Sequence, residues 1–295
     1  MVEKEEKGLY ARAHKKISDL IPDLKGEALS REQWYKLCNI HPTSIKHRDH
    51  REAINEVLNK MAKNKNKIIV KHGSLYKVVD DTLVPINFKN PVGHKVDLVF
   101  PFGIHQYGYL YQGNIAVVFG SKDAGKTAFA LNVIRMNMSK HVIKYWSSEM
   151  VEDELAARLS KYEYLLPEEW KFEAYERSYD FDQVIDPDAI NIIDYLELGG
   201  DEMEYYRGVG LIRKIFDKLD TGVAIIACQK NENAELPKGG SGILEKSRIA
   251  VSLDPGKAVL KVCKNWAEGV VTSPRGKSWS YQLVGGINYV NVQEC

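Results

Sequence analysis

The sequence has few cysteines and no long apolar run. Its 295 residues include four widely separated cysteines without a C-x-x-C pair, which argues against a disulfide framework and against a structural zinc site. No apolar stretch approaches the roughly 20 residues needed to cross a membrane. The charged start of the chain also lacks the apolar core of a signal peptide. We therefore expect a cytoplasmic protein with no membrane segment.

Net charge is also nearly absent, because 41 Lys and Arg residues oppose 40 Asp and Glu residues and leave +1. The distribution is uneven: residues 1–84 contain 17 Lys or Arg, 12 Asp or Glu and five His. A basic N-terminal part beside a slightly acidic remainder is typical of a part that faces nucleic acid. The alternative is a solvated basic face without a ligand.

The most informative motif that the sequence does contain is a phosphate loop. Residues 120–127 read GSKDAGKT and fit the pattern G-x-x-x-x-G-K-[ST]. An apolar run at 115–119 predicts a buried strand before it, and residues 126–138 predict a helix after it. This context favours a nucleotide-binding loop over an ordinary Gly-rich turn. We expect it to bind ATP and Mg²⁺ through Gly120, Ser121, Lys122, Asp123, Ala124, Gly125, Lys126 and Thr127.

Within that loop, two side chains have predicted roles. Lys126 is expected to reach the β- and γ-phosphates, and the Thr127 hydroxyl is expected to bind Mg²⁺.

Strands and helices alternate in the C-terminal part. Strands are expected at 115–119, 142–146, 189–193 and 223–227, with helices at 126–138, 151–163 and 203–219. This alternation predicts an α/β domain over 113–295, with a mostly parallel sheet and helices on both faces. Short strands at 248–253, 258–263 and 278–283 would extend the sheet with antiparallel pairs.

Polar residues stand where three of these strands end. Glu149 follows the second strand, Asp194 the third and Gln229 the fourth. The carboxyl ends of parallel strands meet at one edge of a sheet. We therefore expect beside the loop a base for the attacking water, an acid for magnesium and an amide that senses the γ-phosphate. Taken singly, each carboxylate has an ordinary alternative as a helix cap or a helix-dipole partner.

The N-terminal part, residues 1–80, has a different pattern. Helical patterns at 8–20, from residue 30 and at 47–63 precede a predicted hairpin at 67–79. This order of helix, turn, helix and hairpin resembles a winged helix, a small α+β domain. Residues 81–112 are interrupted by Pro and Gly and predict a connector. A winged helix would bind DNA here, or alternatively protein, through Lys46, Arg48, Arg51 and Lys67.

Together, the C-terminal motifs resemble those of the RecA superfamily, and most closely its DnaB-like replicative helicases. Residues 147–150 read SSEM where that family has SLEM, residues 194–196 read DYL as in the family, and residues 228–229 read CQ in place of SQ. The resemblance covers about residues 98–285. It implies a RecA-like ATPase core in which Glu149 is the catalytic carboxylate, Asp194 the Walker B acid and Gln229 the coupling residue. It also implies a homo-oligomer such as a ring.

In that family a basic finger in a K-x-R-x-G segment completes the ATP site of the neighbouring subunit. Here residues 264–269 read KNWAEG, so Lys264 matches, Trp266 replaces the arginine, and Arg275 is a second candidate. By the same resemblance, the loop after residue 229 faces single-stranded DNA and offers Lys238 and Lys246 to its phosphates. The alternative is a surface loop without a ligand.

The sequence thus predicts a DNA-associated ATPase that couples ATP binding and hydrolysis to DNA binding or remodelling in replication or recombination. Two alternatives stay open. One is an ATP-switched helicase loader or regulator that does not translocate, and the other is a DNA-binding or assembly module with negligible turnover. Stimulation of ATP hydrolysis by single-stranded DNA separates the first interpretation from the other two.

Overall fold

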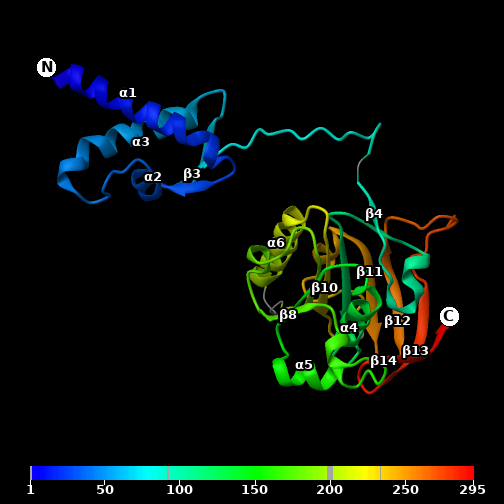
Figure 1. Ribbon diagram of the computed structural model, residues 1–295. Helices are drawn as coiled ribbons and strands as arrows, with labels where there is room; N and C mark the ends of the chain where they lie inside the picture. Colours follow the sequence, from blue (N-terminus) through cyan, green and yellow to red (C-terminus); the bar gives the residue numbers. More distant parts are fainter. Residues whose placement is uncertain (1, 92, 198–201, 233) are drawn as a thin grey trace. The chain divides into compact units, whose positions relative to one another are not determined.

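The chain divides between Asn90 and Pro91 (Figure 1). The computed structural model describes residues 2–91, 93–197, 202–232 and 234–295. The division falls inside the segment 81–112, which the sequence suggested is a connector. Residues 91–112 belong to the second unit because their apolar side chains are buried in its core, among them Leu98, Phe100 and Ile104. No helix among the described residues is long and apolar enough to cross a membrane.

The first unit follows the layout that the sequence predicts for residues 8–80. Its elements are α1 (Val2–Leu20), η1 (Ile21–Leu24), β1 (Ala28–Ser30), α2 (Arg31–Leu37), η2 (Ile45–His47), α3 (Arg48–Lys63), β2 (Ile69–His72) and β3 (Leu75–Val78). The strands form an antiparallel sheet in the order β1-β3-β2. The strand β1 was not predicted, because its three residues show no run of alternating apolar positions.

Local sequence explains why these helices form and pack. A capping box starts α2: Ser30 Oγ accepts the backbone N–H of Gln33, and the Gln33 side chain accepts the N–H of Ser30. The apolar positions of α3 repeat at helical spacing and are buried, including Ile54, Val57 and Leu58. They pack in one core cluster with Trp34 of α2.

The second unit is a nine-stranded sheet in the order β14-β13-β12-β11-β6-β10-β9-β7-β8. Before and within the parallel part lie β4 (Lys95–Val96), η3 (Pro101–Gln106), β5 (Leu110–Tyr111), β6 (Ile115–Gly120), α4 (Lys126–Asn137), β7 (Ile143–Ser147), α5 (Glu152–Leu159), η4 (Pro167–Glu169), β8 (Glu173–Glu176), η5 (Phe181–Gln183) and β9 (Ile190–Leu196). Then follow α6 (Glu202–Lys218), β10 (Val223–Gln229), η6 (Ser241–Leu244), β11 (Ser247–Asp254), β12 (Lys257–Cys263), β13 (Ser278–Val284) and β14 (Asn288–Glu294).

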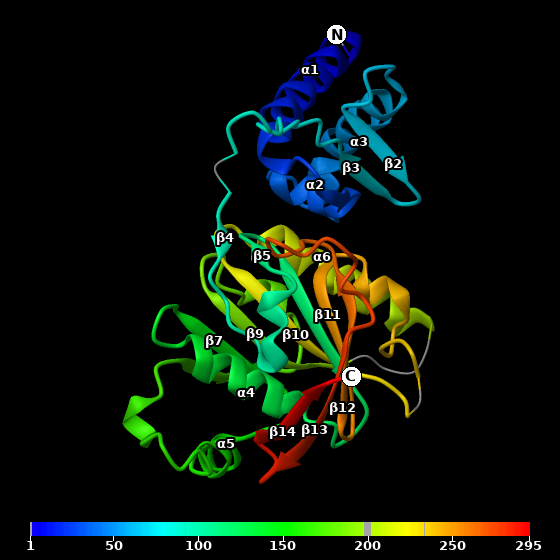
Figure 2. The same ribbon diagram turned by 90° about the vertical axis from the view of Figure 1, so that its right-hand side faces the viewer.

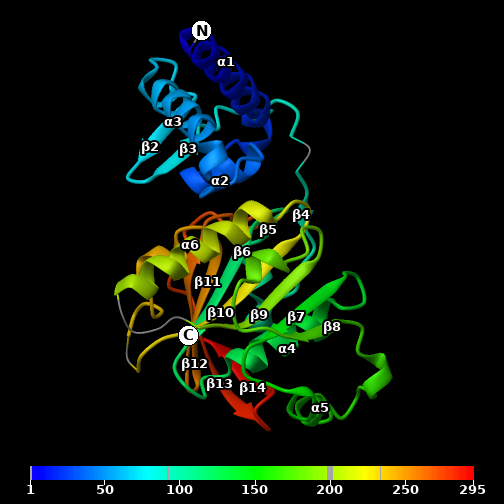
Figure 3. The same cartoon turned by 90° about the vertical axis from the view of Figure 1, so that its left-hand side faces the viewer.

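Helices cover both faces of this sheet, as the sequence predicts. Figure 2 shows α4 in front of the sheet, and Figure 3, from the opposite side, shows α6 in front of it. Strand β6 serves both faces because its side chains alternate: Ala116 and Val118 join the core under α4, whereas Ile115, Val117 and Phe119 join the core under α6. A strand that is buried on both sides reads as a continuous apolar run, which is how the sequence showed it.

The strand order gives the second unit a RecA-like α/β fold. Strand β10 is parallel to and lies between β6 and β9. Three details differ from the expectation. The strand at 247–254 is parallel to β6 and pairs antiparallel only with β12, whereas β8 and β14 were not predicted at all.

Candidate functional site

The phosphate loop connects β6 to α4 and has little space for side chains. A Cβ atom on Gly120 would lie 2.8 Å from the carbonyl oxygen of Leu253, which is closer than packed atoms approach. Gly125 has a φ of +93°, in the left-handed region that glycine adopts without strain, and a Cβ there would lie 3.1 Å from the Tyr289 hydroxyl. Both glycines of the motif are therefore required by the backbone itself.

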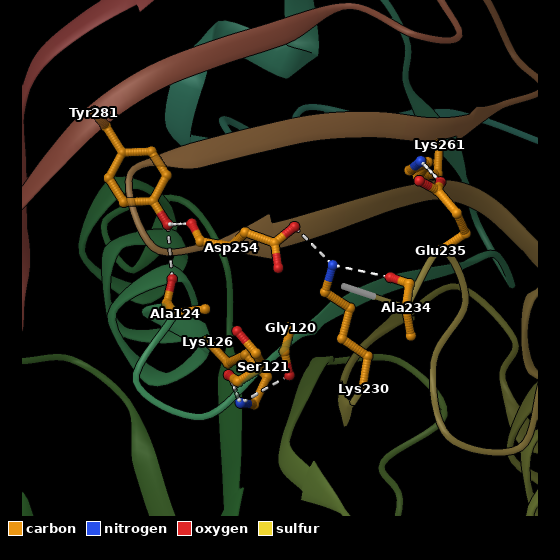
Figure 4. Close-up of polar contacts among 10 residues, drawn as sticks. All are labelled: Gly120, Ser121, Ala124, Lys126, Lys230, Ala234, Glu235, Asp254, Lys261 and Tyr281. Carbon is orange, nitrogen blue, oxygen red and sulfur yellow. Dashed lines mark hydrogen bonds and ion pairs between the residues drawn. The ribbon is translucent and has the colours of Figure 1, made fainter. Parts of the chain in front are cut away.

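Lys126 begins α4, and its ammonium turns back over the loop. The side chain is buried, and Nζ donates to the carbonyl oxygens of Gly120 at 3.2 Å and Ser121 at 2.9 Å (Figure 4). Burial lowers the pKa of Lys126, while the carboxylates of Asp194 and Glu149 act in the opposite direction. The lysine therefore lies within electrostatic range of both predicted acids.

Asp194 on β9 is buried and half-satisfied. The Tyr145 hydroxyl donates to Oδ2 at 2.7 Å, whereas the buried Oδ1 has no hydrogen-bond partner among the described residues. Burial raises the pKa of the Asp194 carboxyl, and the hydroxyls of Tyr145 and Thr127 partly offset this by favouring the ionised form. An orphaned carboxylate oxygen beside the Thr127 hydroxyl fits a hard cation with oxygen ligands such as Mg²⁺.

Glu149 follows β7 at the same edge of the sheet. It lines a cavity of about 290 Å³ together with Ser148, Arg177 and Tyr179. Its charge acts on Lys126 and Asp194. The structure thus brings Lys126, Asp194 and Glu149 together, and the open cavity leaves room at the Glu149 carboxylate.

Gln229 ends β10 directly beside the loop, since it pairs in register with Gly120. Its amide is engaged within the chain: Lys238 Nζ donates to Gln229 Oε1 at 3.1 Å, and the backbone N–H of Lys238 donates to the Gln229 carbonyl at 2.7 Å. The predicted phosphate sensor and one predicted DNA contact are therefore neighbours.

The sequence did not point to the two tyrosines that support the loop. The Tyr281 hydroxyl on β13 lies 2.7 Å from the Ala124 carbonyl oxygen, and the Tyr289 hydroxyl on β14 donates to the Gly125 carbonyl at 2.7 Å. Each bond joins residues more than 150 positions apart, 157 and 164 respectively. No short-range pattern announces such a contact.

The two candidate finger residues lie at the far end of the sheet from the loop. The backbone N–H of Lys264 donates to the Arg248 carbonyl near the start of β11, whereas the end of β11 pairs with Gly120. Lys264 Nζ donates to the Glu245 carbonyl at 2.7 Å, and burial lowers the pKa of Lys264. Arg275 is exposed and lines the same cavity of about 630 Å³ as Lys264. Neither residue reaches the phosphate loop of its own chain.

The remaining predicted DNA contacts divide into available and occupied side chains. Lys46 and Lys67 are exposed, and Arg48 is exposed in an i,i+4 pair with Glu52. Arg51 donates to the carbonyls of His41 and Ser44, so its guanidinium holds the turn before α3 instead of facing solvent freely.

In the second unit, Lys246 Nζ lies 4.4 Å from the centre of the Phe216 ring, a cation–π contact. Its ammonium is therefore packed against α6.

Comparisons with known proteins give a fold but no closer relative. No family model and no curated protein matches the chain. Among solved structures, the ATPase domain of a DnaB-family helicase aligns at 15% identity and a TM-score of 0.46, covering 62% of this chain and 86% of that one. The RadB recombinase aligns at 18% identity and a TM-score of 0.41, covering 58% and 88%.

Both of those structures are RecA-superfamily P-loop ATPases. At these identities and scores the likeness carries no argument about function. Any functional conclusion for this chain rests on its own site.

Proposed function

We propose that the second unit is a magnesium-dependent ATPase. The observation that carries this proposal is the meeting of Lys126, Asp194 and Glu149 at the edge of the sheet where the phosphate loop lies, with one buried Asp194 oxygen unpaired. Buried polar atoms in folded proteins almost always have partners. An unpaired carboxylate oxygen next to a phosphate loop is therefore best explained by a ligand.

In the proposed mechanism each group has one task. The loop N–H groups and the Lys126 ammonium bind the phosphates, and the ammonium turns from the loop carbonyls toward the β- and γ-oxygens. Thr127 and Asp194 would hold Mg²⁺, which when bound neutralises charge on those oxygens. Glu149 accepts a proton from the attacking water in its cavity, and Gln229 orients toward the γ-phosphate.

We further propose that the ATPase is coupled to DNA in replication or recombination. The basic first unit supports this, since its helix and hairpin layout is that of a winged helix and leaves Lys46, Arg48 and Lys67 exposed. The contact between Lys238 and Gln229 also supports it, because a DNA phosphate at Lys238 would act directly on an ATP-site amide. The neighbouring proteins in the comparison include a helicase domain and a recombinase.

A self-contained ATP switch is the second candidate function. It is favoured by the place of Trp266, which stands where the resembling helicases have a finger arginine and whose indole N–H donates to the Cys263 carbonyl. A protein that loads or regulates a helicase needs nucleotide binding and slow turnover without a finger from a neighbour.

The test is ATP turnover by the full chain, measured against protein concentration with and without single-stranded DNA. We expect DNA to stimulate turnover and Lys126→Ala to abolish it, with circular dichroism showing that the variant folds. Undiminished turnover by Lys126→Ala would refute the ATP site. Turnover that DNA does not change would favour the switch.

A further inference from the structure

Lys230 is a buried ammonium close to the ATP site that the mechanism above does not use. It follows Gln229 directly, and its side chain is 3% exposed. Its Nζ forms an ion pair with Asp254 Oδ2 at 2.7 Å and donates to the Ala234 carbonyl at 3.1 Å (Figure 4). Because an unpaired buried charge is strongly unfavourable, these partners fix where the ammonium can lie.

The partners of Lys230 lead in two directions. Ala234 belongs to the loop after β10, so the ammonium ties that loop to the end of β11. In the other direction, the backbone N–H of Lys230 donates to the Gly120 carbonyl at 3.0 Å, the first residue of the phosphate loop. One residue therefore contacts both the loop after β10 and the phosphate loop.

A tyrosine hydroxyl closes the same circuit on the far side. The Tyr281 hydroxyl lies 2.7 Å from the Ala124 carbonyl oxygen and 2.8 Å from the Asp254 carbonyl oxygen (Figure 4). A hydroxyl has a single proton, so it donates fully to only one of the two carbonyls at a time. A movement of Ala124 in the phosphate loop therefore changes the bond that Asp254 receives, and Asp254 holds Lys230.

We propose that Lys230 and Asp254 form a positioning pair that transmits occupancy of the phosphate loop to residues 234–240. The inference rests on the proposed function, because it requires that the loop at 120–127 bind nucleotide. It assigns Lys230 no contact with the nucleotide. The pair acts by keeping the loop after β10 in register with Gly120, so that bound phosphate restrains that loop.

The chain offers a matched control. A second ion pair, between Glu235 and Lys261, also ties the loop after β10 to the β11–β12 hairpin, but its Glu235 side chain is 83% exposed. No hydrogen bond printed among the described residues connects this pair to the phosphate loop. Lys261→Met should therefore loosen the tether without interrupting the circuit through Asp254 and Tyr281.

Hydrogen exchange with and without AMP-PNP and Mg²⁺ tests the proposal on the full chain. In the wild type we expect AMP-PNP to slow exchange in peptides covering 234–240 by about tenfold, the effect of one added interaction of ordinary size on local opening. Lys230→Met should bind AMP-PNP within about threefold of the wild type, since it removes no phosphate contact, and lose the slowing. Lys261→Met should keep it.

Asp254→Asn guards against a folding defect in Lys230→Met. Asp254 is 39% exposed, so its replacement leaves no large cavity, and we expect the same loss of slowing. Equal slowing in the wild type, Lys230→Met and Asp254→Asn would overturn the pair, as would equal loss in Lys261→Met. A wild type that binds AMP-PNP without slowing at 234–240 would overturn this inference alone, whereas a wild type that does not bind AMP-PNP would overturn the ATP site as well.

Discussion

Lys238 Nζ lies 3.1 Å from Gln229 Oε1, so a residue expected to contact DNA touches a residue expected to sense the γ-phosphate. The two are nine positions apart and are joined a second time through the backbone. An ammonium has three N–H donors, so Lys238 can hold the amide and a DNA phosphate together or exchange one for the other. The coupling of DNA to ATP would then need no moving part larger than one side chain.

Lys238→Met should weaken the response of turnover to single-stranded DNA more than it weakens DNA binding itself. The variant loses one phosphate contact, which lowers the salt dependence of binding by a slope of about one. It also frees the Gln229 amide, so we expect the ratio of turnover with DNA to turnover without DNA to fall. Lys246→Met is the control, because its ammonium packs on the Phe216 ring away from Gln229 and should leave that ratio unchanged.

Glu149→Gln should keep nucleotide affinity and slow hydrolysis by roughly 10²-fold or more, the scale of losing a general base. The amide preserves the shape of the side chain within its cavity but removes its charge. Nucleotide binding by fluorescence titration and single-turnover hydrolysis would separate the two effects. Lost binding with normal turnover per bound ATP would show that Glu149 has a structural role.

Arg48 and Arg51 are expected to behave differently, although they lie three positions apart at the front of α3. Arg51→Ala should lower the free energy of unfolding of the first unit by about 2 kcal/mol, since it removes charged hydrogen bonds to two turn carbonyls. Hydrogen exchange of the full chain in urea, followed in peptides from residues 31–63, measures this loss.

Arg48→Ala should leave that stability nearly unchanged, because its exposed pair with Glu52 contributes about 0.3–0.5 kcal/mol. It should instead weaken DNA binding and its salt dependence. Unaltered affinity for both single- and double-stranded DNA would favour a first unit that docks on protein.

Asp194→Asn should abolish most turnover and yet stabilise the protein without nucleotide. Burial raises the folded-state pKa of Asp194, so ionising this carboxyl costs more in the folded chain than in the unfolded one. Its contribution to stability is present at acidic pH and is lost as pH rises through the raised pKa. The variant should therefore gain on the wild type between about pH 5 and pH 8, as measured by thermal unfolding without Mg²⁺ or ATP. A gain at acidic pH only would contradict this sign.

Mixtures of defective subunits test whether the ATP site is shared. Lys126→Ala should be inactive alone, and Lys264→Ala or Arg275→Ala should lose up to about 10³-fold if that residue is the finger. Mixing the loop variant with the finger variant should restore some turnover, because one intact interface can form. Full activity of a monomer in light scattering would rule out a shared site, and loss in only one of the two finger variants would identify the finger.

The sequence predicted the elements whose pattern is local. Strand β6 is buried on both faces and reads as an unbroken apolar run, and α2 starts at a capping box, so both were placed within a residue or two. Strand β8 was missed because all four of its residues are exposed at the sheet edge, which leaves no apolar alternation to detect.

The site was predicted where the order of strands determines it and missed where packing does. Glu149, Asp194 and Gln229 follow from the rule that parallel strands end at one edge. Lys230 was missed because a lysine after a strand ordinarily faces water, and only the position of Asp254 shows that it does not. Arg51 was misjudged for the opposite reason: its helix position suggested a free cation, whereas the turn before it supplies two carbonyl acceptors.

The support of the phosphate loop by Tyr281 and Tyr289 has a consequence for how the protein is made. During synthesis the loop leaves the ribosome long before the two tyrosines that hold its carbonyls, 157 and 164 positions later. A nascent chain would therefore carry an ATP motif without a finished ATP site until the hairpin β13–β14 has been added. Competence to bind nucleotide would then mark a chain whose last strands are already in place.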